Sequence, residues 1–466
     1  MAPTGREEGR GDLAARVLES ARAADCREAE VFIKTSASRQ VAWEPPLRAE
    51  APAHVAISRA VEAGVGLLVV DSEGRTGLAW RGGGPALLDA PDDATIARLV
   101  DDALAAARAG GAHRPPGPPT ASATVADSEG SLDLVDPECL ERPDAALVAM
   151  VEAAALEVAT AGEGALELDR ILATAARTSV RLARAGGFDG AYERTIFALS
   201  IALVPTIVGA EAVTEERWVC RLDDLDPRQA ARDAILRGLP PRAATAHAKP
   251  ATAAAPPSPT PAEPKPGIVL APRAAATLLA ALAPWVTMGL LSSIRPSALS
   301  IIDDGRACGR PGSAPFDGSG APTRRLLLLD RGRAVARIAP DTGPFQRPSY
   351  RDLPIAAPAG LAILPGQRRE DREGPPGAFA PSGPTVRAAV IEVRTGTIWV
   401  VQVRRGEWDS GVAADGLYWE GAPAVLVQAV AATLDDLVYY QVGLPVAAPT
   451  VVLEGLGPWR MPGADR

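Results

Sequence analysis

The sequence predicts an α+β protein with mixed helices and largely antiparallel sheets, an N-terminal α/β part and a β-rich C-terminal domain. Capped, helix-period apolar segments alternate with strand-like runs in the first half of the chain. In the second half, apolar runs are joined by short glycine-containing connections, which favour antiparallel pairing. Between the halves, residues 239–266 are rich in proline and alanine and predict a semi-stiff spacer.

The N-terminal domain is expected to span residues 1–112. Apolar positions at helical spacing predict helices over residues 12–24 and 92–109, and the second ends at a pair of glycines. Apolar and β-branched runs predict strands over residues 30–36 and 65–70.

A central α+β domain is expected over residues 120–238. Aspartate followed by proline, at residues 136–137 and again at 226–227, is a strong signal for the first residues of a helix. These signals predict one helix that runs to about residue 160 and a second that includes residues 229–237. The strand-like runs of this domain cover residues 166–172, 178–183 and 195–204.

The C-terminal domain, residues 267–466, carries hairpin signals. Strands at 325–330 and 334–338 flank one short turn, and strands at 386–393 and 397–403 flank another. A helix over residues 424–437 and a last strand over residues 450–453 complete the domain.

One segment requires a membrane check. Residues 274–294 are uncharged, and their length is close to the ~20 residues that a membrane-spanning helix needs. The segment is rich in alanine, and Pro284 interrupts its hydrogen-bond ladder. We therefore predict two short buried helical segments and no contact with a membrane.

Charge and cysteine usage exclude several classes of protein. With 48 basic and 57 acidic residues the formal net charge is −9, which argues against a nucleic-acid-binding protein. The four cysteines are far apart and form neither a C-x-x-C motif nor a disulfide scaffold, which favours a reducing cytoplasm. The first residues lack the apolar core of a signal peptide.

The motifs of common enzymes are absent from the sequence. His54, His113 and His247 are isolated, so no pair of histidines on one helix turn can hold a catalytic zinc. There is neither a G-x-S-x-G nucleophile motif nor a phosphate-binding loop with a G-K-[ST] end. We therefore assign no catalytic residue and no metal ligand to this chain.

The most informative segment is residues 315–332. Its Asp-Gly pair at 317–318 and Ser-Gly pair at 319–320 predict turns that lead into a strong strand. Two interpretations stay open: a loop that only begins a hairpin, or a loop that offers backbone N–H groups and an arginine to a peptide or partner. The candidate contact residues are Phe316, Asp317, Gly320, Pro322, Thr323, Arg324 and Arg325.

This segment resembles the Phe-Asp-x-x-Gly-x-Pro-Thr-x-Arg stretch of the TldD/PmbA family, in which PmbA is also called TldE. Four further regions resemble the family in the same order along the chain. They are residues 29–32, 64–77, 194–221 and 347–366. The sequence departs from the family pattern at Leu68, where members have arginine, and at Gly360, where they have asparagine.

The resemblance implies a two-component intracellular protease. TldD-type chains carry a His-Glu-x-x-x-His zinc helix and a further cysteine ligand, and TldE-type chains lack this motif and pair with them. This sequence lacks the motif, so it resembles the TldE-type subunit. The resemblance thus implies a TldD-like partner that holds the zinc, an extended or unfolded peptide substrate, and no cofactor in this chain.

Three functions follow as hypotheses. The first is a non-catalytic subunit of a zinc metallopeptidase complex in the cytoplasm, which acts in proteolysis or peptide maturation and binds an extended peptide at a sheet edge. The second is a divergent peptidase that is active without the usual metal site. The third is a stand-alone scaffold that binds peptides or proteins.

Overall fold

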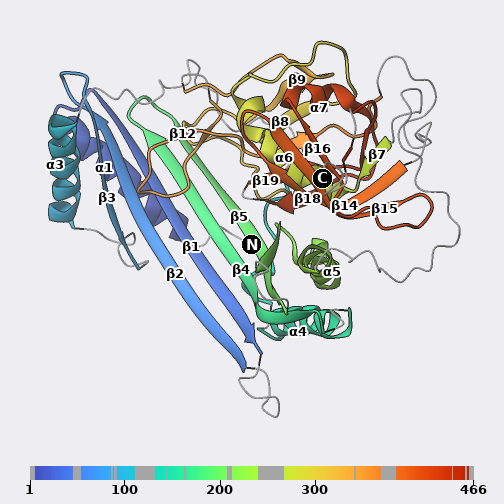
Figure 1. Cartoon of the computed structure of the whole chain (residues 1–466). Helices are drawn as coiled ribbons and strands as arrows, with labels where there is room; N and C mark the ends of the chain where they lie inside the picture. Colours follow the sequence, from blue (N-terminus) through green and yellow to red (C-terminus); the bar gives the residue numbers. More distant parts are fainter. Residues whose placement is uncertain are drawn as a thin grey trace, which may run out of the picture.

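The structure is a computed structural model, which describes residues 6–45, 54–84, 88, 92–110, 132–142, 144–161, 164–206, 212–239, 267–340, 343–368, 385–442, 444–456 and 459–460. Almost all of the predicted spacer, residues 240–266, lies outside the described residues. Figure 1 shows a long twisted sheet beside a β-rich C-terminal part. The predicted α+β class, with largely antiparallel sheets, is confirmed.

The long sheet has the strand order β3-β2-β1-β4-β5-β6, and every neighbouring pair is antiparallel. Because β1 pairs with both β2 and β4, strands from the predicted N-terminal and central domains share this one sheet. The strands are β1 (Glu28–Glu44), β2 (His54–Val70), β3 (Thr76–Gly83), β4 (Leu166–Arg184), β5 (Asp189–Pro205) and β6 (Val213–Val219).

Strands β1 and β2 are far longer than the sequence predicts, and β4 is one strand where two short ones are predicted. The added part of β1 contains the polar run Ser38, Arg39 and Gln40, which interrupts the apolar alternation that marks a strand. Pairing with β2 on one side and β4 on the other satisfies the backbone there, so tertiary pairing overrides the local signal.

Helices cover one face of the long sheet. Helices α1 (Arg6–Ala23) and α3 (Asp93–Ala109) pack on the β1–β2 end. Helices α4 (Asp144–Ala161) and α5 (Pro227–Gly238) pack on the β4–β5 end. Asp226 caps α5, as the Asp-Pro signal predicts, because its carboxylate accepts the backbone N–H groups of Arg228 and Gln229. Asp92 caps α3 in the same way by accepting the Thr95 N–H.

The predicted helix start at Asp136 is wrong. Residues 137–140 form a turn, and the helix begins only at Asp144. The Asp136 carboxylate accepts the backbone N–H groups of Glu138 and Leu222, at 3.0 and 3.3 Å, and so ties this turn to the end of β6. The Asp-Pro pair therefore supplies an Asx-type turn there.

The C-terminal part packs helix α6 (Pro272–Thr287) between two sheets, and one apolar core joins them. The first sheet has the order β16-β15-β14-β7-β20-β17 and the second β10-β9-β8-β13-β19-β18. Strands β7 and β14 are parallel, as are β13 and β19, and the other pairs of these sheets are antiparallel.

The strands of the first sheet are β7 (Gly267–Leu270), β14 (Thr385–Arg394), β15 (Trp399–Trp408), β16 (Tyr418–Gly421), β17 (Val430–Thr433) and β20 (Val451–Leu453). Those of the second are β8 (Ile301–Asp304), β9 (Arg325–Asp330), β10 (Arg333–Ala334), β13 (Leu361–Ile363), β18 (Val438–Gln441) and β19 (Pro445–Ala448). A small ribbon of β11 (Phe345–Gln346) and β12 (Ile355–Ala356) lies between β10 and β13 in the chain.

The predicted β14–β15 hairpin is confirmed. The first predicted hairpin is present as β9–β10, but its second strand covers only Arg333–Ala334 and does not extend over residues 335–338. The prediction of two helical segments in residues 274–294 is wrong, because α6 runs unbroken past Pro284. The prediction of a helix over 424–437 is half wrong. Helix α7 (Pro423–Ala429) ends where Val430 pairs with Leu453 and starts strand β17. Among the helices that the structure describes, none is long and apolar enough to cross a membrane.

Candidate functional site

The second face of the long sheet, opposite the helices, is where the C-terminal part meets the N-terminal part (Figure 1). Loops of the C-terminal part cover the end of this face that includes Phe32 and Leu182. Beyond this covered end, the face carries small polar side chains that are mostly half-exposed. Ser36 lies opposite Thr178 and Gln40 opposite Thr174, and each pair is joined by a side-chain contact of 3.3 Å.

Tyr350 anchors the covered end of this face. Its side chain is buried, and it lies where three glycines of β2 and β3 leave no Cβ. A Cβ on Gly64 would lie 2.2 Å from the ring, and one on Gly82 would lie 2.2 Å from the hydroxyl. A Cβ on Gly66 would lie 2.1 Å from the carbonyl oxygen of Tyr350. Only glycine at these three positions leaves room for Tyr350. We call Gly64, Gly66 and Gly82 the three-glycine surface.

A buried ion cluster lies beside the three-glycine surface. The Glu30 carboxylate of β1 accepts hydrogen bonds from Arg184 of β4, with Nε at 2.7 Å, and from Arg347 of the C-terminal part. The Arg347 guanidinium also lies 4.5 Å from the centre of the Phe32 ring, and burial lowers its pKa. Buried charges of this kind are tolerated because they are paired, so the cluster fixes how the two parts dock.

The predicted contact loop packs against the same covered end of the long sheet. The Phe316 ring is buried and meets Phe188 and Tyr192 edge-to-face, with ring centres 5.5 and 5.1 Å apart. Gly320 has a φ of +78°, and a Cβ there would lie 3.1 Å from Leu182. These two residues of the loop are therefore structural contacts between the parts of the chain.

Asp317 and Thr323 hold the loop in shape. One Asp317 oxygen accepts the N–H and hydroxyl of Ser319 and the N–H of Ala321, at 2.7–3.1 Å. Its other oxygen accepts the Phe345 N–H at 3.0 Å. The Thr323 hydroxyl donates to the carbonyl of Ala314. Both side chains are buried, and these hydrogen bonds hold them within the protein.

The remaining candidates, Pro322, Arg324 and Arg325, are exposed. The Arg325 guanidinium lies 3.9 Å from the Asp304 carboxylate. Any peptide or partner contact by the predicted loop would therefore depend on these three residues, whereas the other candidates face inward.

The sequence analysis does not predict that Glu30, Arg347 and Tyr350 lie together. The contacts that join these two parts of the chain are distant in sequence, as for Tyr350 and its hydrogen-bond partner Glu62, which are 288 residues apart. Two local signals pointed to it. Glu30 is an acid within an apolar run, and a buried acid needs a cationic partner. Closely spaced glycines within a strand indicate the close approach of another part of the chain.

A second buried ion cluster joins the helix layer to the C-terminal core. Glu215 of β6 pairs with Arg237 of α5 at 2.7 Å and with Arg273 of α6 at 2.8 Å. The neighbouring Arg217 pairs with a carboxylate of α5 and lies 4.1 Å from the centre of the Tyr440 ring. Burial raises the pKa of Tyr440 and lowers that of Arg273. This cluster and the Tyr350 contact fix the C-terminal part at separate places.

The outer half of β2 forms an open edge of the long sheet. Strand β3 pairs only with residues 63–70 of β2, whereas β1 pairs with β2 along its whole length. In the part of the chain that the structure describes, no strand pairs with the other side of residues 54–62. Every residue of this segment is exposed, including Val55, Ile57 and Val61. The segment carries two charged residues, Arg59 and Glu62, among mostly apolar and small ones. An exposed, unpaired edge of this kind is a surface for strand addition.

The residues that the structure describes contain no group of three or more His, Cys, Asp or Glu side chains that could hold a metal ion. His54 is exposed at the start of β2, and His113 and His247 lie outside the described residues. The donor set in the described part therefore does not fit a zinc ion.

Comparison with protein-family models gives one match, to the PmbA/TldA metallopeptidase C-terminal domain over residues 267–373. Residues 267–373 are therefore similar to this C-terminal domain. This domain includes α6, β8, β9 and β13, the predicted contact loop, and both Arg347 and Tyr350. Comparison with curated protein sequences gives no match.

Solved structures share the fold over nearly the whole chain. TldE from Thermococcus kodakarensis is 13% identical, with a TM-score of 0.67 over 96% of this chain and 99% of its own. A proposed modulator of DNA gyrase from Bacteroides thetaiotaomicron is 15% identical, with a TM-score of 0.66 over 96% and 98%. Another from Thermotoga maritima is 14% identical, with a TM-score of 0.63 over 96% and 99%. The resemblance to the TldD/PmbA family is thus confirmed for the C-terminal domain, and the TldE fold extends beyond that domain.

Proposed function

We propose that this chain is a non-catalytic, TldE-type subunit of a cytoplasmic zinc metallopeptidase complex that acts in proteolysis or peptide maturation. A TldD-like partner would supply the zinc and the catalytic groups. The observation that carries the proposal is a PmbA/TldA metallopeptidase C-terminal domain in a chain whose described residues offer no metal site. The likeness of the fold to TldE supports it.

The open β2 edge is the part of this chain that would meet an extended peptide. At about 3.3 Å per residue, residues 54–62 offer roughly 30 Å of free backbone donors and acceptors. The hydroxyl and amide side chains of the adjoining sheet face would keep the surroundings of the peptide wet and polar. Backbone pairing binds a peptide with little regard to its sequence, as the handling of unfolded substrates requires.

The experiment is co-expression with a TldD-like chain that carries a His-Glu-x-x-x-His motif, each chain with its own affinity tag. We expect the two chains to co-purify, and only the pair to cleave a labelled unfolded peptide in a chelator-sensitive manner. A partner whose motif glutamate is changed to glutamine is the matched control for cleavage. Cleavage by this chain alone would favour the divergent peptidase, and a chain that ignores the partner would contradict the pairing.

Strand addition has its own test, in two neighbouring proline variants, Ile57→Pro and Ser58→Pro. In an antiparallel strand, the N–H groups of adjacent residues point to opposite sides, so one variant removes a bond to β1 and the other removes a free edge donor. We expect one variant to lower thermal stability and the other to leave stability intact and weaken peptide binding. Unchanged peptide binding in the stable variant would exclude this edge.

The open edge also suits a stand-alone scaffold that binds peptides or proteins. The two functions differ in the zinc partner, because a scaffold would bind peptide with the same affinity whether or not a TldD-like chain is present. Measuring peptide binding with and without the partner separates them.

A further inference from the structure

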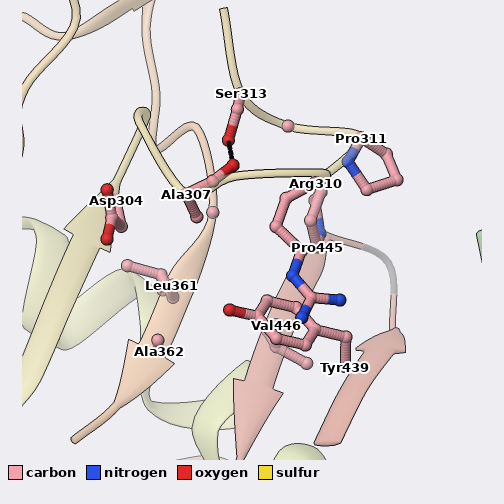
Figure 2. Close-up of a pocket in the computed structure, with 12 residues that line it drawn as sticks. Asp304, Ala307, Arg310, Pro311, Ser313, Leu361, Ala362, Tyr439, Pro445 and Val446 are labelled. Carbon is pink, nitrogen blue, oxygen red and sulfur yellow. Dashed lines mark hydrogen bonds between the residues drawn. The ribbon is translucent and has the colours of Figure 1, made fainter. Parts of the chain in front are cut away.

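A small pocket opens on the second C-terminal sheet, apart from the β2 edge (Figure 2). Its volume is about 30 Å³, and its walls are the side chains of Leu361, Ala362, Pro445 and Val446. A single water needs about 10–15 Å³ of such space, so the pocket admits a small aliphatic group and excludes a ring.

One end of this pocket, here called the Arg310 pocket, carries a guanidinium group without an anionic partner. Arg310 stacks on the Tyr439 ring with its central carbon 3.2 Å from the ring centre. Within the described part of the chain, this guanidinium makes neither an ion pair nor a hydrogen bond. Stacking holds an arginine in place while its N–H groups stay available, which is how such groups are presented to carboxylates.

The backbone that carries Arg310 is fixed. Arg194 of β5 donates to the Pro311 carbonyl at 3.0 Å, and the Gly309 N–H donates to the Leu132 carbonyl at 2.7 Å. The Ser313 N–H closes a turn onto the Arg310 carbonyl at 3.0 Å. The guanidinium is therefore presented by an ordered loop, and binding would not have to order the loop first.

Asp304 lies at the other end of the pocket (Figure 2). Its carboxylate already accepts the Arg306 N–H at 3.0 Å and lies 3.9 Å from Arg325. The Ser313 hydroxyl is also engaged, because it donates to the Ala307 carbonyl at 2.7 Å. The charged group that remains available in the pocket is thus the Arg310 guanidinium. The Asp304 carboxylate at the far end would repel an anion, which favours binding of the anion at Arg310.

We propose that the Arg310 pocket binds the C-terminal carboxylate of a peptide that ends in a small aliphatic residue. The carboxylate would take two parallel N–H bonds from Arg310, and the last side chain would fill the space between Leu361 and Val446. This inference rests on the proposed function only in that the chain meets peptides. It concerns a different surface from the β2 edge and requires neither a partner nor cleavage.

The test is fluorescence anisotropy with the purified full-length chain and a short labelled Gly/Ser peptide ending in valine, as the free acid and as the C-terminal amide. A charge-assisted bidentate contact predicts about tenfold tighter binding of the acid than of the amide. Arg310→Gln should remove this preference, and Arg310→Lys should restore part of it. Equal affinities of the acid and the amide for the unaltered chain would overturn the proposal.

Two further variants keep the result specific. Gly360 lines the pocket, and a Cβ there would meet only Pro445, at 4.0 Å, so Gly360→Ala narrows the pocket without a clash and should weaken the preference for the acid. Arg333 is exposed at the other edge of the same sheet, and Arg333→Gln should leave the preference unchanged. If Arg333→Gln removes it as well, the preference is a general charge effect and the pocket is excluded. Because the assay uses this chain alone, these outcomes test the Arg310 pocket whether or not the chain pairs with a TldD-like chain.

Discussion

Replacing Gly64 by alanine tests the contact between the three-glycine surface and Tyr350. The added Cβ would lie 2.2–2.4 Å from three carbons of the Tyr350 ring, where van der Waals contact requires about 3.5 Å. The ring cannot retreat easily, because its hydroxyl accepts from Arg351 and donates to Glu62, both at 2.9 Å. Gly64→Ala should therefore force the C-terminal part away from β2.

The expected cost follows from the size of the overlap. Overpacking a well-filled core costs about 1–3 kcal/mol of unfolding free energy, and this overlap exceeds an ångström, so we expect the upper end. Tyr350→Ala removes a buried aromatic side chain and should cost about 3–5 kcal/mol. In the Tyr350→Ala background the space is empty, so adding Gly64→Ala should be neutral or slightly stabilising.

The assay is urea unfolding followed by tryptophan fluorescence, to which Trp80 contributes from 6.2 Å away from the Tyr350 ring. Gly83→Ala is the matched control, because it lies beside Gly82 and a Cβ there meets nothing within 4 Å. The unaltered chain, the two single variants Gly64→Ala and Tyr350→Ala, and their double variant form a double-mutant cycle with an expected coupling of about 1–3 kcal/mol. Additive effects of Gly64→Ala and Tyr350→Ala, or a cost equal to that of Gly83→Ala, would refute this account of the glycines.

Three other predictions concern buried groups. Glu30→Gln leaves two buried arginines without a counter-charge and should cost about 3–5 kcal/mol in the same urea assay; a loss below about 1 kcal/mol would mean that the cluster is hydrated. Burial raises the pKa of Asp303 to about 6, so the stability that this acid contributes is present below its ordinary pKa near 3.8 and is lost as pH rises through about 6. Asp303→Asn should flatten thermal stability between about pH 4 and 6 and raise it at pH 7 by up to about 3 kcal/mol, and an unchanged pH profile would contradict this. Burial raises the pKa of the Cys139 and Cys220 thiols to about 11, so an aromatic disulfide reagent at pH 8 should first modify the exposed Cys308; a fast phase that persists in Cys308→Ser would disprove this order.

Local signals predicted the elements whose causes are local. The helix over residues 92–109 follows from its apolar spacing and the glycine pair that ends it, and the β14–β15 hairpin follows from two apolar runs around a glycine turn. The Asp-Pro pair at 226–227 capped a helix, but the same pair at 136–137 formed a turn. The difference is that the Asp136 carboxylate accepts a hydrogen bond from the Leu222 N–H, a partner that no local pattern reveals.

The site was less predictable than the fold, because its contacts span the chain. Phe316 and Asp317 are predicted as contact residues of a structured loop, and only their distant partners, Tyr192 and Phe345, show that they face inward. Glu30 and Arg347 are 317 residues apart, and nothing in either local sequence specifies the other. The Arg310 pocket likewise needs strands from three parts of the chain to form its walls.

In the proposed function, this chain supports catalysis by a partner and performs none itself. The most direct measurement is the cleavage of a labelled unfolded peptide by the purified chain, by a TldD-like zinc-motif chain, and by the two together, each with and without a chelator. The account predicts cleavage by the co-purified pair, its loss with the chelator, and no cleavage by this chain in either condition. Cleavage by this chain alone, at a rate that the chelator does not change, would contradict it.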